Sequence, residues 1–329
     1  MMKDLNPLVT ALERERSSRV LVYITGTKPP IFGTKVANDV LPFFKKILEG
    51  YSTGTKKISL VLDTTGGNLD TPWPLVNLIR EYCEEFEVIV PEKALSAGTL
   101  IALGADKVVM LPYSNLSPID PAAEFIDAEK KQAKRIEIED IIGYINFAKE
   151  KVGIKDQAVL GEVMKELGRE INPTMLGSAN RTHSLIRSLA KKLLNLRGGP
   201  SLKRWQVNQI VKHLSEDMFS HRHLINRKEA ADTVGFGSMI EFADAKTKSA
   251  VENLANFYTD YLEVEKSFDP AVVLGADAEK THKLPRAVVH SRELAFSMVS
   301  AYHLARVAGP AGQANINVNN TQNSWEKVS

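Results

Sequence analysis

The 329-residue sequence has one cysteine and almost no net charge, and each scarcity excludes a class of protein. The single cysteine, Cys83, cannot form an intramolecular disulfide, so we expect a reducing compartment and a buried, inert thiol. The 42 Lys and Arg residues nearly balance the 40 Asp and Glu residues, which argues against a dedicated nucleic-acid or anionic-membrane surface. Apolar residues make up 43% of the chain, enough for one large core or two smaller ones.

The sequence also lacks long apolar runs, a dinucleotide-binding loop and a metal-binding pattern. Residues 1–18 contain acidic side chains and no continuous apolar stretch, so we expect no signal peptide there, and no later run approaches a membrane span. We therefore predict a soluble, cytoplasmic protein with no integral membrane segment. The absence of G-x-G-x-x-G, and of metal spacing beyond His221 and His223, predicts neither a cofactor nor a metal site.

Residues 19–121 alternate short apolar runs with amphipathic ones, a pattern typical of parallel strands joined by crossover helices. The predicted strands are 19–25, 56–63, 86–91 and 106–111, and the predicted helices are 36–48, 96–104 and one that begins at Thr71 and Pro72. This pattern predicts an α/β core with a parallel sheet.

The remainder of the chain reads as largely helical. The predicted helices are 140–151, 156–168, 180–196, 204–218, 227–234, 245–265 and 291–308. We divide the chain into an N-terminal helical segment 1–18, the core 19–121, a helical continuation 122–240, C-terminal helices 241–308 and a disordered, Asn-rich tail 309–329. The charged stretch 124–139 is interpreted as a solvated helix face or exposed loop, and a flap over a cleft has the same composition.

Two loops of the α/β core carry residues suited to chemistry, and each follows a predicted strand. Loop 63–68 contains two consecutive glycines, which can expose backbone N–H donors, although a Gly-Gly pair alone also fits a tight turn. Loop 93–99 contains Ser96, followed by Ala97 and Gly98 at the start of an apolar helix, where a serine is most often only an N-cap. In a parallel sheet both loops lie at the carboxyl edge, where ligands usually bind. A serine flanked by backbone donors is the minimal apparatus for acyl transfer.

The order of these motifs resembles the Clp protease/crotonase superfamily. The motifs are the Gly-Gly turn, then Ser-Ala-Gly-Thr opening an apolar helix, then Ala-Asp-Lys-Val-Val-Met and Leu-Ser-Pro-Ile-Asp-Pro. Within the superfamily the chain is most similar to the serine dehydrogenase proteinase family, cytoplasmic relatives of signal peptide peptidase A. The resemblance is strong over 56–121 and looser over 173–235.

The resemblance implies a serine peptidase that hydrolyses peptides or unfolded protein segments through an acyl-enzyme. Ser96 is the implied nucleophile, and the N–H groups of Gly67 and Ala97, with Gly66 next in line, are the implied oxyanion hole. The chain departs from its relatives at Thr65, where proline is usual. The glycines, not the proline, supply the donors.

The general base is not fixed by the resemblance. Asp120 occupies the approximate place of the Clp histidine, and the later block 220–223 contains His221 where Clp relatives have an aspartate. We rank His221 first as the base, with Asp120 as its orienting carboxylate, and keep His183 and Lys151 in reserve. Each of these candidate residues also has a non-catalytic interpretation, as a turn former, a surface residue or an interface residue.

Alternative functions stay open at this point. The main alternative is a non-catalytic scaffold or partner-binding module on the same fold, and an acyl-CoA enzyme of the crotonase type is a further one. We expect a peptide or unfolded protein as substrate, a homo-oligomer, and an unfoldase or adaptor as a conceivable partner. The oligomer prediction rests on the apolar side chains of residues 245–265. They offer more apolar surface than one sheet is expected to cover.

Overall fold

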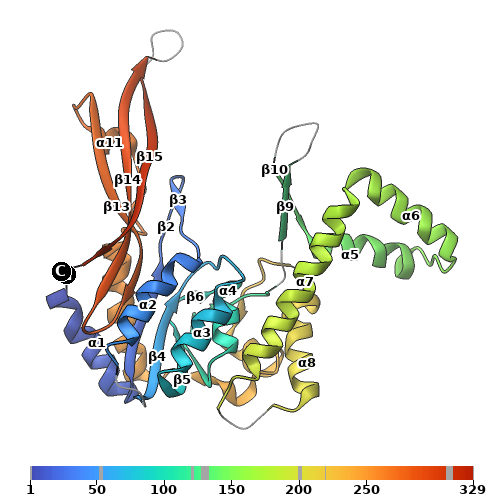
Figure 1. The fold of residues 1–329 in the computed structure, drawn as a ribbon, viewed down its shortest axis with the longest axis horizontal. Coiled ribbons are helices and arrows are strands. Elements are labelled where there is room, and N and C mark those ends of the chain that lie inside the picture. Colours follow the sequence, from blue (N-terminus) through green and yellow to red (C-terminus); the bar gives the residue numbers. More distant parts are fainter. Residues whose placement is uncertain are drawn as a thin grey trace.

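The computed structural model describes residues 2–51, 55–119, 122–126, 133–198, 202–218, 220–308 and 314–328. Its centre is an eight-stranded sheet with the strand order β12-β7-β5-β4-β1-β13-β14-β15 (Figure 1). The five strands from β12 to β1 are parallel to one another, and the remaining three are antiparallel. We call these the parallel half and the antiparallel half.

The parallel half has the architecture predicted for the α/β core. Its strands are β1 (Arg19–Thr25), β4 (Thr55–Asp63), β5 (Cys83–Val90), β7 (Lys107–Met110) and β12 (Ile240–Phe242). The strands β1, β4, β5 and β7 each have a run of buried, mostly apolar residues because both faces of the sheet are covered there. The predicted fold class is confirmed. One boundary differs, since Cys83 begins β5 instead of lying on the preceding helix.

Helices cover the two faces of the parallel half. One face carries α2 (Leu41–Leu48), α3 (Pro72–Arg80), α4 (Ala97–Leu103) and α7 (Pro173–Leu194). The other face carries α1 (Met2–Arg16) and α10 (Ala245–Tyr261). Val251, Leu254 and Tyr258 of α10 are fully buried against the sheet. These side chains are therefore core, and the apolar surface on which the oligomer prediction rested is not available. Association itself stays a prediction.

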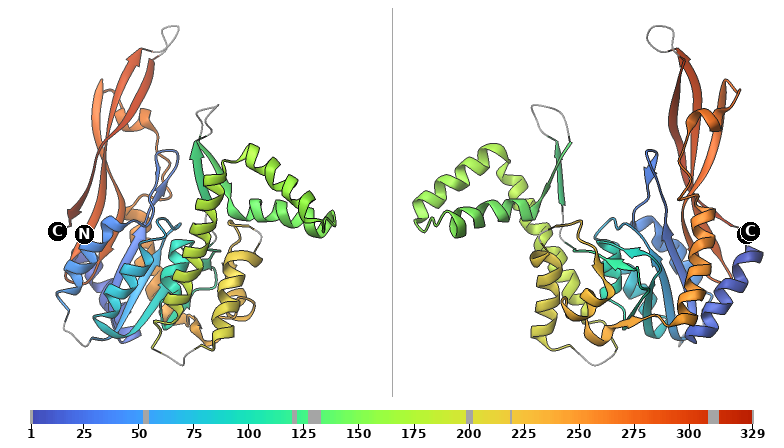
Figure 2. Two further views of the ribbon diagram at one scale, coloured as in Figure 1. Left: turned by 45° about the vertical axis from the view of Figure 1, so that its right-hand side comes forward. Right: turned by 180° about the vertical axis from the view of Figure 1, so that it is seen from behind.

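Shorter elements connect these layers. The helical ones are η1 (Asn38–Val40), α5 (Ile138–Asn146), η2 (Phe147–Lys151), α6 (Gln157–Glu170), α8 (Arg204–Lys212), η3 (His213–Asp217), α9 (Arg227–Asp232), η4 (Gly237–Met239) and α11 (Pro270–Leu274). The short strands are β2 (Thr27–Lys28), β3 (Phe32–Gly33), β6 (Lys93–Ala94), β8 (Asn115–Leu116), β9 (Ala122–Ile126), β10 (Ala133–Glu137) and β11 (Ile225–Asn226). Helices α5 and α6 form an arm that projects away from the body (Figure 2). None of the helices in the described ranges is long and apolar enough to cross a membrane.

The antiparallel half corrects two predictions. The segment predicted as a helix over 291–308 forms β14 (Ala295–Ala308), which pairs with β13 (Glu279–His290). The tail predicted to be disordered forms β15 (Ala314–Lys327), which pairs with β14 along its length. The three strands extend well beyond the body as a twisted ribbon (Figure 1). A separate small core stabilises it, built around Phe32, Phe268, Leu274, Leu284, Tyr302 and Leu304.

The charged stretch 124–139 is also different from the prediction. Its backbone forms an antiparallel hairpin of β9 and β10, with Ala133 opposite Ile126, and then enters α5. It is therefore neither a continuous helix face nor an open loop. Residues 127–132, at the tip of the hairpin, lie outside the described residues.

Candidate active site

Ser96 sits on a sharp turn between a strand and a helix. After β5 ends, the chain makes the short strand β6 and reaches Ser96 directly before α4. Its backbone has φ 50° and ψ −107°, a region that a non-glycine residue rarely adopts and that costs about 1–3 kcal/mol. The Ser96 side chain makes no capping hydrogen bond to α4. The structure therefore does not use this serine as an ordinary N-cap, and strain of this kind is concentrated at functional sites.

Neighbouring hydroxyl groups hold the turn in this conformation. The backbone N–H of Ser96 donates to Ser117 Oγ at 2.8 Å. The Thr99 hydroxyl lies 2.9 Å from the carbonyl oxygens of both Ala94 and Ser117. Ser117 and Thr99 are both buried. Since buried hydrogen bonds resist exchange with water, they tie the turn firmly to the loop after β8.

The Gly-Gly loop lies against the Ser96 turn, as the sequence predicts for loops at one sheet edge. At Gly66, φ is 96°, and a Cβ there would stand 2.9 Å from Ser96 Cβ and 2.7 Å from the Leu95 carbonyl oxygen. At Gly67, a Cβ would stand 2.3 Å from the Val36 carbonyl oxygen. Neither position has room for a side chain. Glycine is required at both for the loop to approach Ser96 and the segment around Val36 this closely.

The three candidate oxyanion donors differ in availability. The Gly66 N–H donates to Thr64 Oγ1 at 3.1 Å and is therefore occupied. Within the described ranges, the N–H groups of Gly67 and Ala97 have no acceptor. Ala97 is the first residue of α4, where the helix dipole favours negative charge. Of the three candidate donors, Gly67 and Ala97 are thus the two whose N–H groups have no partner among the described residues.

The block that contains His221 lies on the same edge of the molecule. Strand β11 pairs with β8, with Ile225 opposite Leu116, and β8 pairs with β6, with Leu116 beside Ala94. Neighbouring strands are about 4.8 Å apart, so the backbone of β11 lies roughly 10 Å from that of β6. His221 is four residues before β11, and Ser96 two residues after β6. The strand pairing thus places the start of β11, which follows the His221 turn, two strand spacings from β6.

The other candidate bases have different surroundings. Asp120 lies outside the described residues. His183 is buried on α7 at 8% exposure, among the apolar residues of that helix. Lys151 is exposed at the end of η2, in the projecting arm.

A histidine–carboxylate pair near β11 was not recognised in the sequence. His223 Nε2 lies 2.7 Å from Glu229 Oε1, and both side chains are partly buried. Asn226 caps α9 through its side chain and so fixes the first turn, where Glu229 lies. The signal was an acidic residue three positions after an Asn N-cap and six positions beyond His223. It is the same kind of pairing that orients a catalytic imidazole.

Two further features concern the Cys83 thiol and the residues that could bind a metal ion. Burial raises the pKa of the Cys83 thiol to about 11, so it stays protonated and unreactive at neutral pH. Within the described ranges, no group of three or more His, Cys, Asp or Glu side chains is arranged to hold a metal ion.

Known proteins resemble parts of this chain. An uncharacterized protein of Methanocaldococcus jannaschii is 41% identical over 66 residues, which are 20% of this chain and 23% of that protein. A second uncharacterized protein of this organism is 25% identical over 170 residues, which are 48% of this chain and 57% of that protein. The matches thus span less than two thirds of either relative.

One solved structure and one family model are also similar to this chain. The membrane-bound stomatin-specific protease 1510-N, solved with a substrate peptide, has a TM-score of 0.37 and 16% identity, covering 64% of this chain and 71% of that one. The family model described as ClpP-like SDH-type serine proteinase matches residues 8–143, which include both loops of the candidate site. Residues 8–143 therefore carry the signature of the ClpP-like SDH-type serine proteinases, the family that the sequence resembles.

Proposed function

We propose that the protein is a serine peptidase in which Ser96 attacks a peptide carbonyl to form an acyl-enzyme. The main observation behind the proposal is the strained Ser96 turn, whose side chain makes no capping bond and whose Cβ lies beside a glycine loop with no room for side chains. Strain at a residue persists only when its surroundings hold it in place, and here Ser117 and Thr99 do so. The family match over both loops points to the same reaction.

Backbone donors would stabilise the tetrahedral intermediate. As the Ser96 oxygen bonds to the substrate carbonyl carbon, negative charge develops on the carbonyl oxygen. The unoccupied N–H groups of Gly67 and Ala97 are the groups that would bind that charge. Because both belong to rigid backbone, they need little reorganisation during the reaction, and such donors are worth about 10²–10³ in kcat each.

An imidazole from the 220–223 turn would take the Ser96 proton and later return it to the leaving amine. We assign this role to His221, with Asp120 as its orienting carboxylate. His221 lies in the block that the three short strands bring toward Ser96. An imidazole titrates near pH 6.5, so it needs no shift to act at neutral pH, whereas a lysine must lose roughly three units.

Replacement of the nucleophile tests the proposal. Ser96→Ala should lower kcat for an unstructured protein substrate by about 10⁶, while circular dichroism and the melting temperature stay those of a folded chain. Ser178→Ala, which removes a serine of α7 outside the site, is the matched control and should retain full activity. Activity that survives in the purified Ser96→Ala protein would overturn the proposal.

A second pair of variants tests the base. His221→Ala should lower kcat by about 10²–10⁴, with the remaining activity no longer falling below pH 6.5. His223→Ala removes the imidazole paired with Glu229 and serves as the comparison. If His223→Ala shows the larger loss and the altered pH profile, His223 and Glu229 replace His221 and Asp120 in the assignment.

A further inference from the structure

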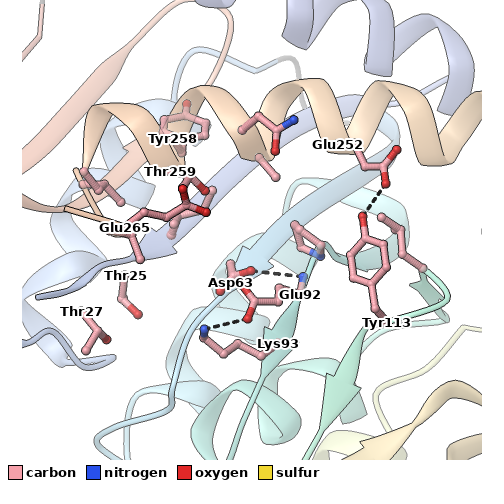
Figure 3. Close-up of a pocket in the computed structure, with 17 residues that line it drawn as sticks. Thr25, Thr27, Asp63, Glu92, Lys93, Tyr113, Glu252, Tyr258, Thr259 and Glu265 are labelled. Atoms are coloured by element: carbon pink, nitrogen blue, oxygen red, sulfur yellow. Dashed lines mark hydrogen bonds and ion pairs between the residues drawn. The ribbon is translucent and has the colours of Figure 1, made fainter. Parts of the chain in front are cut away.

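A cavity opens at the carboxyl edge of the parallel half, on the opposite face of the sheet from α4. It lies between α10 and the ends of β1, β4, β5 and β7, and its volume is about 350 Å³ (Figure 3). The segments that form it continue into the two loops of the candidate active site. Asp63 is the first residue of loop 63–68, and Lys93 is the first residue of loop 93–99. The proposed peptidase mechanism uses no residue of this cavity.

One part of the cavity is apolar. Ile24, Leu111 and Leu262 contribute aliphatic side chains, and Tyr258 contributes its ring. The Tyr258 hydroxyl is bonded to His290 Nδ1 at 2.8 Å, so it is not available to a ligand. This wall therefore offers contact to a hydrocarbon or aromatic group and no hydrogen bond.

The polar part of the cavity is dominated by carboxylates. Asp63, Glu92, Glu252 and Glu265 line it, and Lys93 is the only lysine or arginine among its described lining residues. Lys93 Nζ already lies 3.1 Å from Glu92 Oε1. Glu252 is paired with Lys248 at 2.8 Å and accepts a hydrogen bond from the Tyr113 hydroxyl.

Two of these carboxylates are left without a cationic partner. In the described part of the chain, neither Asp63 nor Glu265 forms an ion pair, and the Asp63 carboxylate accepts hydrogen bonds from the backbone N–H groups of Glu92, at 3.2 Å, and of Lys93. Figure 3 shows Asp63 near the middle of the pocket, with Glu265 reaching in from the segment after α10. Asp63 is half-buried, so its carboxylate gains most from a cation that enters beside it, and the exposed Glu265 adds a second negative charge to the lining.

The titration of Asp63 is consistent with incomplete compensation. Burial raises its pKa to about 7, the nearby Lys93 charge lowers the pKa, and the Glu92 charge raises it. Near pH 7 the side chain is therefore ionised in only part of the molecules. A bound cation would favour the ionised form, so cation binding should strengthen as the pH rises.

We propose that this cavity binds a small organic cation, consisting of a single ammonium group on a short aliphatic or aromatic body. The ammonium group would lie between Asp63 and Glu265, where it supplies the missing positive charge. The body would lie against Leu262 and the Tyr258 ring. Anions are repelled by the same carboxylates, and neutral compounds leave them uncompensated.

The binding test uses phenethylammonium chloride, measured by isothermal titration calorimetry. We expect saturable binding at one site per chain, at least tenfold tighter than that of 2-phenylethanol or 3-phenylpropionate, which share the ring but not the positive charge. At pH 6 about one tenth of Asp63 is ionised and at pH 8.5 nearly all of it, so the ammonium should bind about tenfold tighter at pH 8.5. Absent binding, or equal binding of the three compounds, would overturn the proposal.

Substitutions in the lining test whether the ligand binds within the cavity. Asp63→Asn keeps an oxygen to accept the Glu92 N–H and removes the charge, so it should weaken binding at least tenfold and abolish the pH dependence. Glu265→Gln, which lies outside both catalytic loops, should also weaken binding, and Ala255→Phe should block it by filling the space beside α10. Glu162→Gln, on the projecting arm, is the control. Unchanged affinity in both Glu265→Gln and Ala255→Phe would show that the cation binds elsewhere.

The proposal is independent of the peptidase assignment. Because Ser96 lies on the other face of the sheet, Ser96→Ala should bind phenethylammonium as tightly as the unmodified protein. Failure of peptide hydrolysis together with retained ammonium binding would reject only the proposed function. The reverse result would reject only the cavity.

Discussion

The parallel and antiparallel halves of the central sheet are stabilised in different ways. The parallel strands are covered by helices on both faces and contribute to two large clusters of buried side chains. The distal part of the antiparallel ribbon depends on a separate, smaller cluster around Tyr302 and Leu304. Both loops of the candidate active site extend from the parallel half. The comparison indicates that the site is built on the more extensively packed part of the molecule, where a strained turn can be maintained.

The largest expected effect comes from a pair of Leu→Ala substitutions, one in each half, that each create a cavity in a packed core. Leu60 of β4 and Leu304 of β14 are both fully buried, so each Leu→Ala change should lower the free energy of unfolding by about 2–5 kcal/mol. Leu60→Ala should weaken protection of the whole parallel half against hydrogen exchange. Leu304→Ala should accelerate exchange only in the distal ribbon, because its cluster is separate. Equal acceleration throughout the chain in both variants would show that the halves unfold as one unit.

Two glycine substitutions, one near each half, compare the halves by their effect on kcat. Gly67→Ala places a Cβ 2.3 Å from the Val36 carbonyl oxygen, so the loop must move and kcat should fall by about 10²–10³, as for loss of one oxyanion donor. Gly275→Ala, near the ribbon, is the control. Its φ is 59° and a Cβ there has no neighbour within 4 Å, so it should lower stability by about 1 kcal/mol and leave kcat unchanged. A similar loss of kcat in both variants would mean that general destabilisation explains the effect of Gly67→Ala.

The pH dependence of stability should depend on the junction between the halves. His290, at the end of β13, is buried and pairs with β1, and burial lowers its pKa from 6.5 to about 4. The unfolded chain therefore takes up a proton at higher pH than the folded chain does. Stability should decrease as the pH falls from 6.5 to 4, by up to about 3 kcal/mol from this residue. His290→Asn removes the titrating group, so its free energy of unfolding, measured by urea titration, should vary less over this interval. An unchanged slope would assign the acid sensitivity to other groups.

The smallest effect concerns the contact between the ribbon's end and the parallel half. The Trp325 ring lies 4.9 Å from that of Phe43, and its Nε1–H donates to Asp39 Oδ2 at 2.9 Å. Trp325→Phe keeps an aromatic ring and removes the hydrogen bond, so we expect a loss of about 1 kcal/mol or less. A loss above that, measured by urea unfolding, would show that β15 contributes more to the body than its position suggests.

How much the sequence revealed also differs between the halves. Strand β1 was predicted with its observed bounds, since 19–25 is a continuous apolar run typical of a strand buried on both faces. Strand β15 was missed because its many Asn residues have low strand propensity, although Ile316 and Val318 alternate with them and pack on the ribbon core. Strand β14 was taken for a helix because its Ala, Leu and Met residues also favour helices.

In the candidate site, too, some features could be predicted from the sequence and others could not. The family motif identified Ser96 and the two glycines from local sequence. The φ of Ser96, the occupied N–H of Gly66 and the His223–Glu229 pair depend on contacts between distant segments, which no local pattern encodes. The cavity beside Asp63 was missed for the same reason, because α10 closes it from almost 200 positions away.

The most direct measurement is the intact mass of the protein after treatment with a fluorophosphonate. A serine activated for nucleophilic attack reacts with this reagent, whereas an inert serine at a helix start does not. We expect one adduct per chain, located on Ser96 by peptide mapping, and none in Ser96→Ala. An unmodified mass for the folded protein, or the same adduct in Ser96→Ala, would contradict the central claim that Ser96 is the nucleophile of a serine peptidase.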